Sequence, residues 1–475
     1  MRTSKIALSL ACLGMVVSCG GGGTPTPTAT VAPTPTPTPT PTTSTCSLES
    51  RQQFVADVMD EWYLFPTLLD TTVNPANFND VQSYIDALVA PARAESKDRY
   101  FSYITSIAEE NAFFNSGSSA GFGFRLIYDT TNRRVFLAET FDNTPALGAN
   151  LERGTELIAV GTSSTDLETI NSLMATGGPQ AVIDALGPSD PGVTRVFDVI
   201  DASGVRREVS VTKAEYDLDP VPRYGAQIIN DGGRQVGYLR LTNFINVAID
   251  ELTAAFDDFK AAGVTELVID LRYNGGGGIN VLEHFADMMG AATDGEVFET
   301  IAFRDSKSAN DETYRFAAQV QSIAPTRIAF ITTSGSASAS EALINGMQPY
   351  LGTDMALIGA NTFGKPVGQS AFDLTACDDR LRVVTIKLEN ADGLGEYFEG
   401  LAATVPNSCR ANDDIFHDFG DPQEDMLATA LDFLAGRGTC TPIAGGPATT
   451  QAIGRALLQP ERPSSVIEHE APGVY

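Results

Sequence analysis

The sequence predicts a multidomain chain of mixed α+β and α/β class, with a small helical domain, a β-rich domain and an α/β core in that order. Three observations lead to this prediction. A chain of 475 residues is too long for one ordinary core. Apolar residues recur at helical spacing early in the chain, and short β-rich runs follow them. Beyond these runs, strands alternate with amphipathic helices, which is typical of an α/β layer fold.

The first residues have the composition of a secretory signal. Arg2 and Lys5 precede an apolar run from Ile6 to Val17, which Ser18 and Cys19 follow, so we expect residues 1–18 to be removed. The ending Val16-Val17-Ser18-Cys19 resembles the lipobox of bacterial lipoproteins, in which the cysteine is lipidated. That resemblance implies a lipid anchor in the bacterial cell envelope, facing the periplasm or the outer surface. The alternative is ordinary cleavage that leaves a free thiol.

A linker and a small helical domain are expected next. Residues 19–45 are a glycine run followed by Thr-Pro repeats, a composition that forms no core and favours an extended chain. Apolar residues then recur at helical spacing between Phe54 and Trp62, and again near residues 81–88. We therefore predict a helical domain over residues 46–112.

Short β-rich runs separated by Gly, Asp and Asn turns predict a β-rich domain over residues 113–215. Gly121-Phe122-Gly123-Phe124 opens its first strand, and Thr144-Pro145-Ala146 follows at a distance. Together these features resemble a PDZ domain, where such a loop offers backbone N–H groups to a peptide's terminal carboxylate. The resemblance implies a PDZ-like fold in which Gly121, Phe122, Gly123 and Phe124 bind peptide. For the motif alone, a strand-opening turn is the alternative.

The α/β core is predicted over residues 222–437. Its expected strands lie near residues 236–241, 265–271, 328–332 and 355–359. The closing helix is expected to begin at Asp421, with Pro422 in its first turn. Residues 441–475 read as an irregular tail.

One segment of the core joins a predicted strand to a predicted helix: Gly335-Ser336-Ala337-Ser338-Ala339-Ser340-Glu341. Ser338 and Glu341 have the spacing of a capping box, which stabilises a helix start and catalyses nothing. A serine at a helix N-terminus also lies where backbone N–H groups stabilise a developing oxyanion. Both interpretations stay open on this segment alone.

Lys365 follows the apolar strand near residues 355–359, within Asn361-Thr362-Phe363-Gly364-Lys365-Pro366-Val367-Gly368-Gln369. Such a lysine is usually a solvated surface residue. Against apolar walls, however, its charged form loses hydration, its pKa falls, and the neutral amine becomes available as a base. Gln369 is spaced to hydrogen-bond to that amine.

Together these segments resemble the carboxyl-terminal processing protease family, also called tail-specific proteases, over nearly the whole mature chain. The resemblance implies a peptidase core of ClpP/crotonase-like type and hydrolysis of peptide bonds through an acyl-enzyme. It places the nucleophile at Ser338, the general base at Lys365 and a supporting amide at Gln369. It also implies an oxyanion hole formed by the backbone N–H groups of Gly276, in the turn Asn274-Gly275-Gly276-Gly277, and Ala339.

Cysteine usage agrees with export. If Cys12 leaves with the signal and Cys19 is lipidated, four cysteines remain for an oxidising compartment: Cys46, Cys377, Cys409 and Cys440. Four cysteines allow three pairings. We favour Cys377 with Cys409, which flank one segment, and Cys46 with Cys440, which ties the ends of the folded region together. Zinc is the rival interpretation, but the sequence lacks a CxxC motif.

The formal net charge of −29 disfavours a nucleic-acid partner, because phosphate binding needs a basic surface. We expect protein or peptide substrates and neither a metal nor an organic cofactor. Two alternatives remain. One is a Ser-His-Asp hydrolase using His417, although the sequence has no G-x-S-x-G elbow. The other is a non-catalytic peptide-binding lipoprotein that keeps the same fold as a scaffold.

Overall fold

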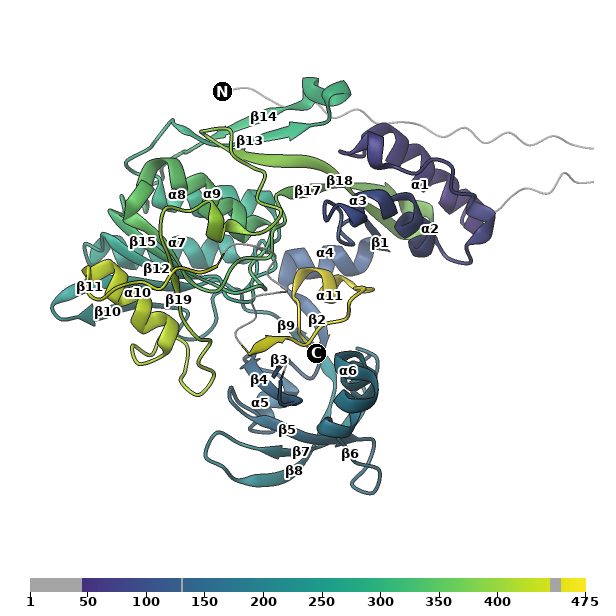
Figure 1. Ribbon diagram of the computed structural model, residues 1–475, viewed down its shortest axis with the longest axis horizontal. Coiled ribbons are helices and arrows are strands. Elements are labelled where there is room, and N and C mark those ends of the chain that lie inside the picture. The colour runs from purple at the N-terminus through teal and green to yellow at the C-terminus, as the bar shows by residue number, and fades with distance from the viewer. Residues whose placement is uncertain (1–44, 130, 445–453) are drawn as a thin grey trace, which may run out of the picture. The chain divides into compact units, whose positions relative to one another are not determined.

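The computed structural model describes residues 45–129, 131–444 and 454–475, which belong to one compact unit (Figure 1). The predicted signal peptide, the lipidation site Cys19 and nearly all of the Thr-Pro linker lie outside the described residues and stay predictions. Within those three ranges, no helix is long and apolar enough to cross a membrane.

The core is a six-stranded sheet with the strand order β10-β11-β12-β15-β16-β19. Its strands are β10 (Ala226–Asp231), β11 (Arg234–Arg240), β12 (Glu266–Asp270), β15 (Arg327–Thr332), β16 (Met355–Gly359) and β19 (Ser408–Arg410). All neighbours from β11 to β19 pair in parallel, whereas β10 is antiparallel to β11. Parallel strands are covered on both faces, which explains why β12, β15 and β16 are continuous apolar runs. The four predicted core strands are confirmed.

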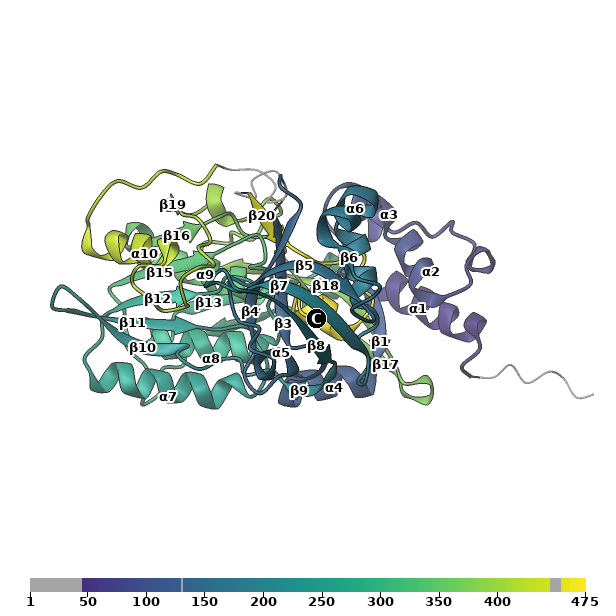
Figure 2. The ribbon, with the colours of Figure 1, turned by 90° about the horizontal axis from the view of Figure 1, so that it is seen from below.

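Helices cover both faces of this sheet (Figures 1 and 2). One face packs against α7 (Ala248–Ala261), α8 (Ile279–Met289) and α9 (Ala339–Leu351). The other face packs against α10 (Asp425–Ala435). The prediction that this closing helix begins at Asp421 was wrong, because its N-cap is Glu424, whose carboxylate accepts a hydrogen bond from Leu427 N at 3.0 Å.

A second sheet adjoins the N-terminal helices. It contains β1 (Tyr103–Ser106), β13 (Val297–Phe303), β14 (Glu312–Arg315), β17 (Val367–Leu374) and β18 (Asp379–Asn390). Apolar side chains of α1 (Leu48–Trp62), α2 (Val81–Leu88) and α3 (Ala90–Ala94) form one cluster with side chains of β17 and β18. The predicted helices are present, but β1 also lies within residues 46–112 and pairs with β18. The N-terminal helices therefore share a core with the later strands.

A seven-stranded sheet lies in the β-rich part of the chain. Its strands are β3 (Phe124–Asp129), β4 (Arg134–Thr140), β5 (Glu156–Gly161), β6 (Glu168–Thr169), β7 (Thr194–Ile200), β8 (Arg206–Thr212) and β20 (Arg455–Leu457). Around it lie α4 (Ile107–Ser116), α5 (Pro145–Gly148), α6 (Ile170–Leu186) and the pair β2 (Ser118–Gly121) and β9 (Ala214–Asp217). Short 3-10 helices occupy Pro66–Leu68, Pro75–Asn77, Asp305–Asn310, Gly352–Asp354, Thr375–Cys377 and Leu401–Ala403.

The tail after residue 441 is not irregular throughout, which corrects the prediction. β20 pairs antiparallel with β3, and α11 (Val466–Glu470) forms a short helix with Ser465 as its N-cap. Neither element shows a strong helical or strand periodicity in its own sequence. Both depend on partners far away in the sequence, so local periodicity does not reveal them.

The disulfide pairing predicted from the sequence was wrong. The bonds join Cys46 to Cys377 and Cys409 to Cys440, with Cα–Cα distances of 5.5 and 4.7 Å. Cys46 precedes α1, which packs against β18, and Cys377 lies in the turn between β17 and β18. Cys409 is on the edge strand β19, and Cys440 follows α10, which covers the same sheet. Each bond therefore ties a helix end to the sheet that the helix packs on.

Candidate active site

A pocket of about 350 Å³ brings the predicted catalytic residues together. It lies where α9 begins, beyond the carboxyl ends of the parallel strands, which is the usual position for a site in an open α/β sheet. Its lining includes Ser338, Ala339, Lys365 and Gln369. Residues separated by many positions in the sequence therefore face one cavity.

Ser338 is the N-cap residue of α9 and forms a capping box with Glu341, as the spacing predicted. It also lines the pocket, so its capping role does not exclude the predicted chemical role. Its backbone has φ 55° and ψ −116°, a conformation that non-glycine residues rarely adopt. Such strain persists only where the surroundings enforce it, and it is concentrated at functional sites.

Glu341 links the two predicted catalytic segments, a role that sequence reasoning missed. Its side chain is 0% exposed and accepts hydrogen bonds from Ser338 N at 3.1 Å, Gly364 N at 2.7 Å and Lys365 N at 2.7 Å. Burial raises the pKa of Glu341, and these hydrogen bonds oppose the rise. The capping-box spacing was the available signal, but it describes only the bond to Ser338.

Lys365 lies at the end of the segment that follows β16. Its Nζ stands 5.0 Å from the centre of the Phe101 ring. Burial lowers the pKa of Lys365 below that of an ordinary lysine, and the carboxylate of Glu470 is the largest opposing influence. Gln369 lines the same pocket, with its Nε2 donating to the Phe101 carbonyl at 3.0 Å. Desolvation thus favours the neutral amine that a base requires.

The glycine turn after β12 packs directly against Ser338. At Gly276, with φ +109°, an added Cβ would lie 2.7 Å from Ser338 Cβ and 3.0 Å from Ala339 N. However, Gly276 N already donates to Asn274 Oδ1 at 2.9 Å. This bond occupies the N–H predicted for the oxyanion hole. The next residue, Gly277, lines the pocket beside Ala339, and its N–H makes no hydrogen bond within the described residues.

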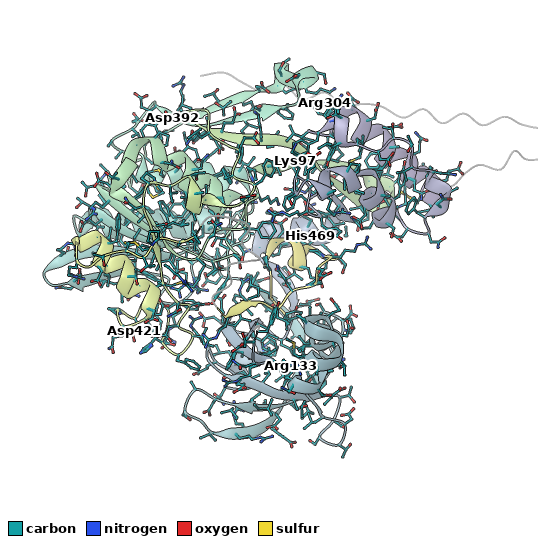
Figure 3. The ribbon with its side chains drawn as sticks, viewed as in Figure 1. Lys97, Arg133, Arg304, Asp392, Asp421 and His469 are labelled. Carbon is teal, nitrogen blue, oxygen red and sulfur yellow. A yellow bond between two sulfur atoms is a disulfide. The ribbon has the colours of Figure 1, made fainter. Side chains whose placement is uncertain are left out.

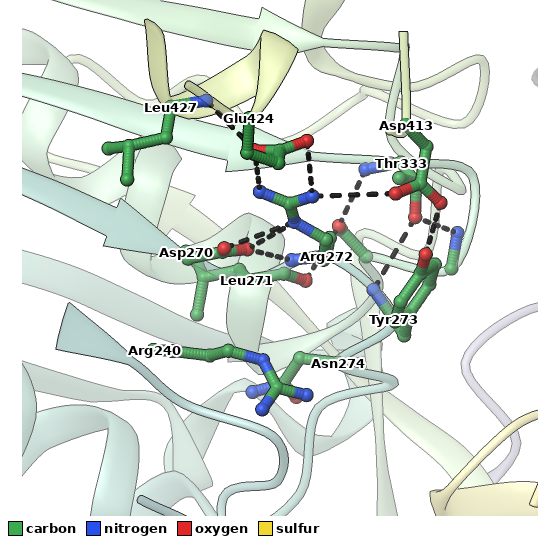
Figure 4. A network of polar contacts seen from close by, with 12 residues as sticks. Arg240, Asp270, Leu271, Arg272, Tyr273, Asn274, Thr333, Asp413, Glu424 and Leu427 are labelled. Carbon is green, nitrogen blue, oxygen red and sulfur yellow. Dashed lines mark hydrogen bonds and ion pairs between the residues drawn. The ribbon is translucent and has the colours of Figure 1, made fainter. Parts of the chain in front are cut away.

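A buried ionic network holds this turn in place, and it too was missed from the sequence. Figure 4 shows the Arg272 guanidinium between the carboxylates of Asp270 and Glu424. The distances are 3.0 Å from Nε to Asp270 Oδ1 and Oδ2, 2.9 Å from Nη1 to Glu424 Oε1, and 2.8 Å from Nη2 to Glu424 Oε2. The next residue, Tyr273, donates through its hydroxyl to Asp413. A fully paired network of this kind fixes backbone geometry, here directly before Asn274.

The histidine considered as an alternative base lies away from this pocket. His417 pairs with Asp414 at 2.5 Å, and its side chain is 42% exposed. None of the residues lining the pocket, all from the described part of the chain, is a histidine. The geometry therefore favours Lys365 over His417 as the partner of Ser338.

The predicted peptide-binding loop lies between β2 and β3. Phe122 and Phe124 are both buried in the apolar cluster of the β-rich domain, and their rings stack at 5.4 Å. The N–H groups of Gly123 and Phe124 both donate to the main-chain oxygen of Tyr475, at 2.8 and 3.3 Å. The loop thus presents its backbone donors to a single oxygen atom.

Two stretches of the chain match known family models. Residues 235–405 match the model described as Peptidase family S41. Residues 50–103 match the model described as the Peptidase S41 N-terminal domain. The first stretch contains Gly277, Ser338, Ala339, Lys365 and Gln369, and the second covers most of α1 and all of α2 and α3.

Curated relatives carry names from the same family. The carboxyl-terminal-processing protease of a Synechocystis species is 24% identical over 266 residues, which is 55% of this chain and 56% of that protein. The protein of the same name from a Picosynechococcus species is 27% identical over 267 residues, or 54% of this chain and 57% of that protein. The chain thus spans little more than half the length of these relatives.

A solved structure shares the fold. The crystal structure described as an S41 protease from Bacteroides fragilis superposes with a TM-score of 0.62 at 23% sequence identity. The match covers 81% of this chain and 97% of the other. The common fold therefore extends well beyond the two stretches matched by family models.

Proposed function

Since this chain belongs to the carboxyl-terminal processing protease family of S41 peptidases, we propose that it is a serine endopeptidase with Ser338 as nucleophile and Lys365 as general base. The observation that carries the proposal is the single pocket lined by both side chains at the N-terminus of α9. Its substrates are proteins or peptides, and the mechanism uses neither a metal nor an organic cofactor.

The reaction begins when neutral Lys365 removes the proton from Ser338 Oγ as this oxygen attacks the scissile carbonyl carbon. The tetrahedral intermediate then collapses, the C–N bond breaks, and the Lys365 ammonium group protonates the leaving amine. A water molecule, deprotonated by Lys365, attacks the acyl ester. The ester C–O bond then breaks, the Lys365 ammonium group returns its proton to Ser338 Oγ, and the acid product is released.

Two backbone N–H groups are proposed to hold the oxyanion. Ala339 supplies one, because it is the first residue of α9 and its N–H has no partner within the helix. Gly277 supplies the other, replacing Gly276, whose N–H is bound to Asn274. Gln369 is proposed to orient the Lys365 amine through its amide oxygen, while its nitrogen is held by Phe101.

Substrate recognition is assigned to the β-rich domain, which we propose to be PDZ-like over residues 113–215. The main support is that backbone donors of the loop before β3 already hold a main-chain oxygen. A substrate tail would add a strand to the edge of β3. The core over residues 222–437 is proposed to be of ClpP/crotonase-like type. Anchoring in the cell envelope through Cys19 is proposed from the sequence alone.

Incubation with an unfolded protein substrate tests the peptidase proposal. We expect the unaltered chain to cleave it and Ser338→Ala and Lys365→Ala to lose all measurable cleavage while remaining folded. His417→Ala is the matched control and is expected to retain full activity. If both active-site variants cleave as fast as the unaltered chain, the proposal is wrong.

A non-catalytic peptide-binding scaffold is the second candidate function, supported by the occupied loop before β3. It predicts peptide binding without cleavage. The presence of Ser338, Lys365 and Gln369 in one pocket argues against it, because a scaffold has no need for all three. The same assay separates the two functions.

A further inference from the structure

Gly473, Val474 and Tyr475 lie along β3 as an added strand. Tyr475 N donates to Phe124 O at 2.9 Å, and Leu126 N donates to Gly473 O at 2.8 Å. Val474 forms an antiparallel bridge with Arg125 between these bonds. Farther along the same edge, Leu457 of β20 pairs with Ile127. The edge of β3 is therefore paired by the tail of the same chain.

The Tyr475 side chain fills an apolar pocket of the β-rich domain. It is 6% exposed and belongs to the cluster that contains Phe122, Ile170, Leu173 and Leu458. Its hydroxyl donates to the Leu458 carbonyl at 2.9 Å. An apolar pocket with one acceptor at its end matches an aromatic side chain that has a polar tip.

The loop before β3 is shaped to admit a peptide backbone at this position. At Gly121, an added Cβ would lie 2.6 Å from the carbonyl carbon of Tyr475 and 3.1 Å from its oxygen. A side chain at Gly121 would therefore displace the tail. Gly123 adopts φ +84°, which turns the loop so that its N–H and that of Phe124 point at one oxygen.

The same tail reaches the catalytic pocket. Glu470, the last residue of α11, lines the pocket together with Ser338 and Lys365. Tyr103 hydroxyl donates to Glu470 Oε1 at 3.1 Å, and the His469 ring stacks on the Tyr103 ring at 3.6 Å. Figure 3 labels His469 on this helix. The tail thus places a carboxylate beside the proposed base.

Residues 470–472 join these two docking points. Asn243 Nδ2 donates to Glu470 O at 2.8 Å, and Pro472 packs so closely on Gly275 that an added Cβ there would lie 2.9 Å from Pro472 Cδ. Arg125, fully buried on β3, donates to the carbonyls of Pro472 and Tyr273. Occupancy of the β3 edge by residues 473–475 and the position of Glu470 are therefore connected through Ala471 and Pro472 alone.

We propose that residues 471–475 are an intramolecular ligand of the surface formed by the β3 edge and the loop at residues 121–124, where they exclude a substrate tail while bound and keep Glu470 in the catalytic pocket. This inference rests on the proposed function of the β3 edge and this loop as the substrate-binding surface. The external ligand that displaces the segment is a polypeptide ending in an aromatic residue with a free carboxylate, because that chemistry fits the two N–H donors and the apolar pocket. Displacement frees the segment that holds Glu470 beside Lys365.

Peptide binding measured without cleavage tests this proposal. The probe is a fluorescent peptide with the sequence Ala-Pro-Gly-Val-Tyr and a free carboxyl terminus, and every protein carries Ser338→Ala. Removal of residues 471–475 is expected to strengthen binding about tenfold or more, because it removes a competitor present at high effective concentration. Tyr475→Ala in the unshortened chain is expected to strengthen binding as well, and it replaces the deletion as the test if the deletion impairs folding.

Three controls define the outcomes. Glu461→Gln, at an exposed position of the same tail, is expected to leave affinity unchanged. Gly121→Val in the shortened chain is expected to abolish binding, and an amidated peptide is expected to bind more weakly. Equal affinity for the unshortened and shortened chains, or no binding by a folded shortened chain, overturns the proposal. Because the assay needs no cleavage, a chain that binds as predicted but never hydrolyses substrate refutes only the peptidase function.

Discussion

The buried carboxylate of Glu341 accepts a hydrogen bond from the backbone N–H of Lys365 at 2.7 Å. The carboxylate of Glu341 also accepts hydrogen bonds from Ser338 N and Gly364 N. One side chain on α9 thus fixes the backbone of the proposed nucleophile and of the proposed base. Since neither backbone shifts without breaking a bond to Glu341, we regard Glu341 as a positioning residue.

Glu341→Gln should lower kcat about 10- to 100-fold while KM changes little, because a small misplacement of reacting groups has effects of this size. The glutamine side chain has only one acceptor oxygen. Its NH₂ group, itself a donor, would face a backbone N–H that donates to the carboxylate of Glu341. We also expect the free energy of unfolding to fall by about 1–3 kcal/mol. Steady-state kinetics and denaturant unfolding measure both effects. The exposed Glu396→Gln is the matched control, and equal losses in both variants would refute the positioning role.

The pH profile of cleavage should report the ionisation of Lys365. Because only the neutral amine is a base, kcat/KM should rise with pH, with a midpoint below the 10.5 of an ordinary lysine. The charged groups that act on Lys365 are Glu470, Asp98, Arg382 and Glu341. Glu470 raises the pKa of Lys365, so Glu470→Gln should move the midpoint to lower pH. A midpoint that moves upward or stays in place contradicts this assignment.

Gly276→Ala should reduce cleavage below detection, although its own N–H is not the proposed oxyanion donor. An added Cβ would lie 2.7 Å from Ser338 Cβ, at a φ of +109° that L-residues rarely adopt. Gly278→Ala is the matched control. The φ of Gly278 is −71°, and the nearest atom to an added Cβ is the movable Asn280 Oδ1. The measurement is kcat/KM of the two variants. An equal loss of activity in both would contradict the view that close packing of Gly276 on Ser338 is what matters.

The two disulfides make a prediction independent of catalysis. Peptide mapping without reduction should recover Cys46 linked to Cys377 and Cys409 linked to Cys440. Replacing Cys46 and Cys377 by serine should lower the free energy of unfolding by about 2–5 kcal/mol, as for native disulfides in general. A map that joins Cys46 to Cys440 would restore the pairing favoured by the sequence.

The order of elements in the core was predictable because each strand carries its own signal. β12 and β16 are apolar on both faces, so burial in a parallel sheet follows from composition alone. The segment around Ser338 was predictable for a different reason, since the capping box and the proposed nucleophile occupy the same helix start. Lys365 and Gln369 were predictable as a pair because their segment directly follows an apolar strand, β16.

What the sequence did not reveal depends on contacts between distant residues. The tail around Tyr475 takes up its extended pairing only because β3 supplies the partners, and its composition has no β-periodicity. The bond between Gly276 N and Asn274 depends on how the turn closes, which a glycine run leaves undetermined. The cysteine pairing depends on which sheet each helix covers. Local patterns carry none of this information.

The central claim is that Ser338 is a nucleophile activated by Lys365, and covalent labelling with a fluorophosphonate tests it most directly. Intact-mass and peptide analysis should find one adduct on Ser338, none in Ser338→Ala, and a labelling rate at least about 100-fold lower in Lys365→Met. Lys387→Met, at a lysine outside the pocket, should label normally. An adduct on another residue, or unchanged labelling of Lys365→Met, would contradict the account.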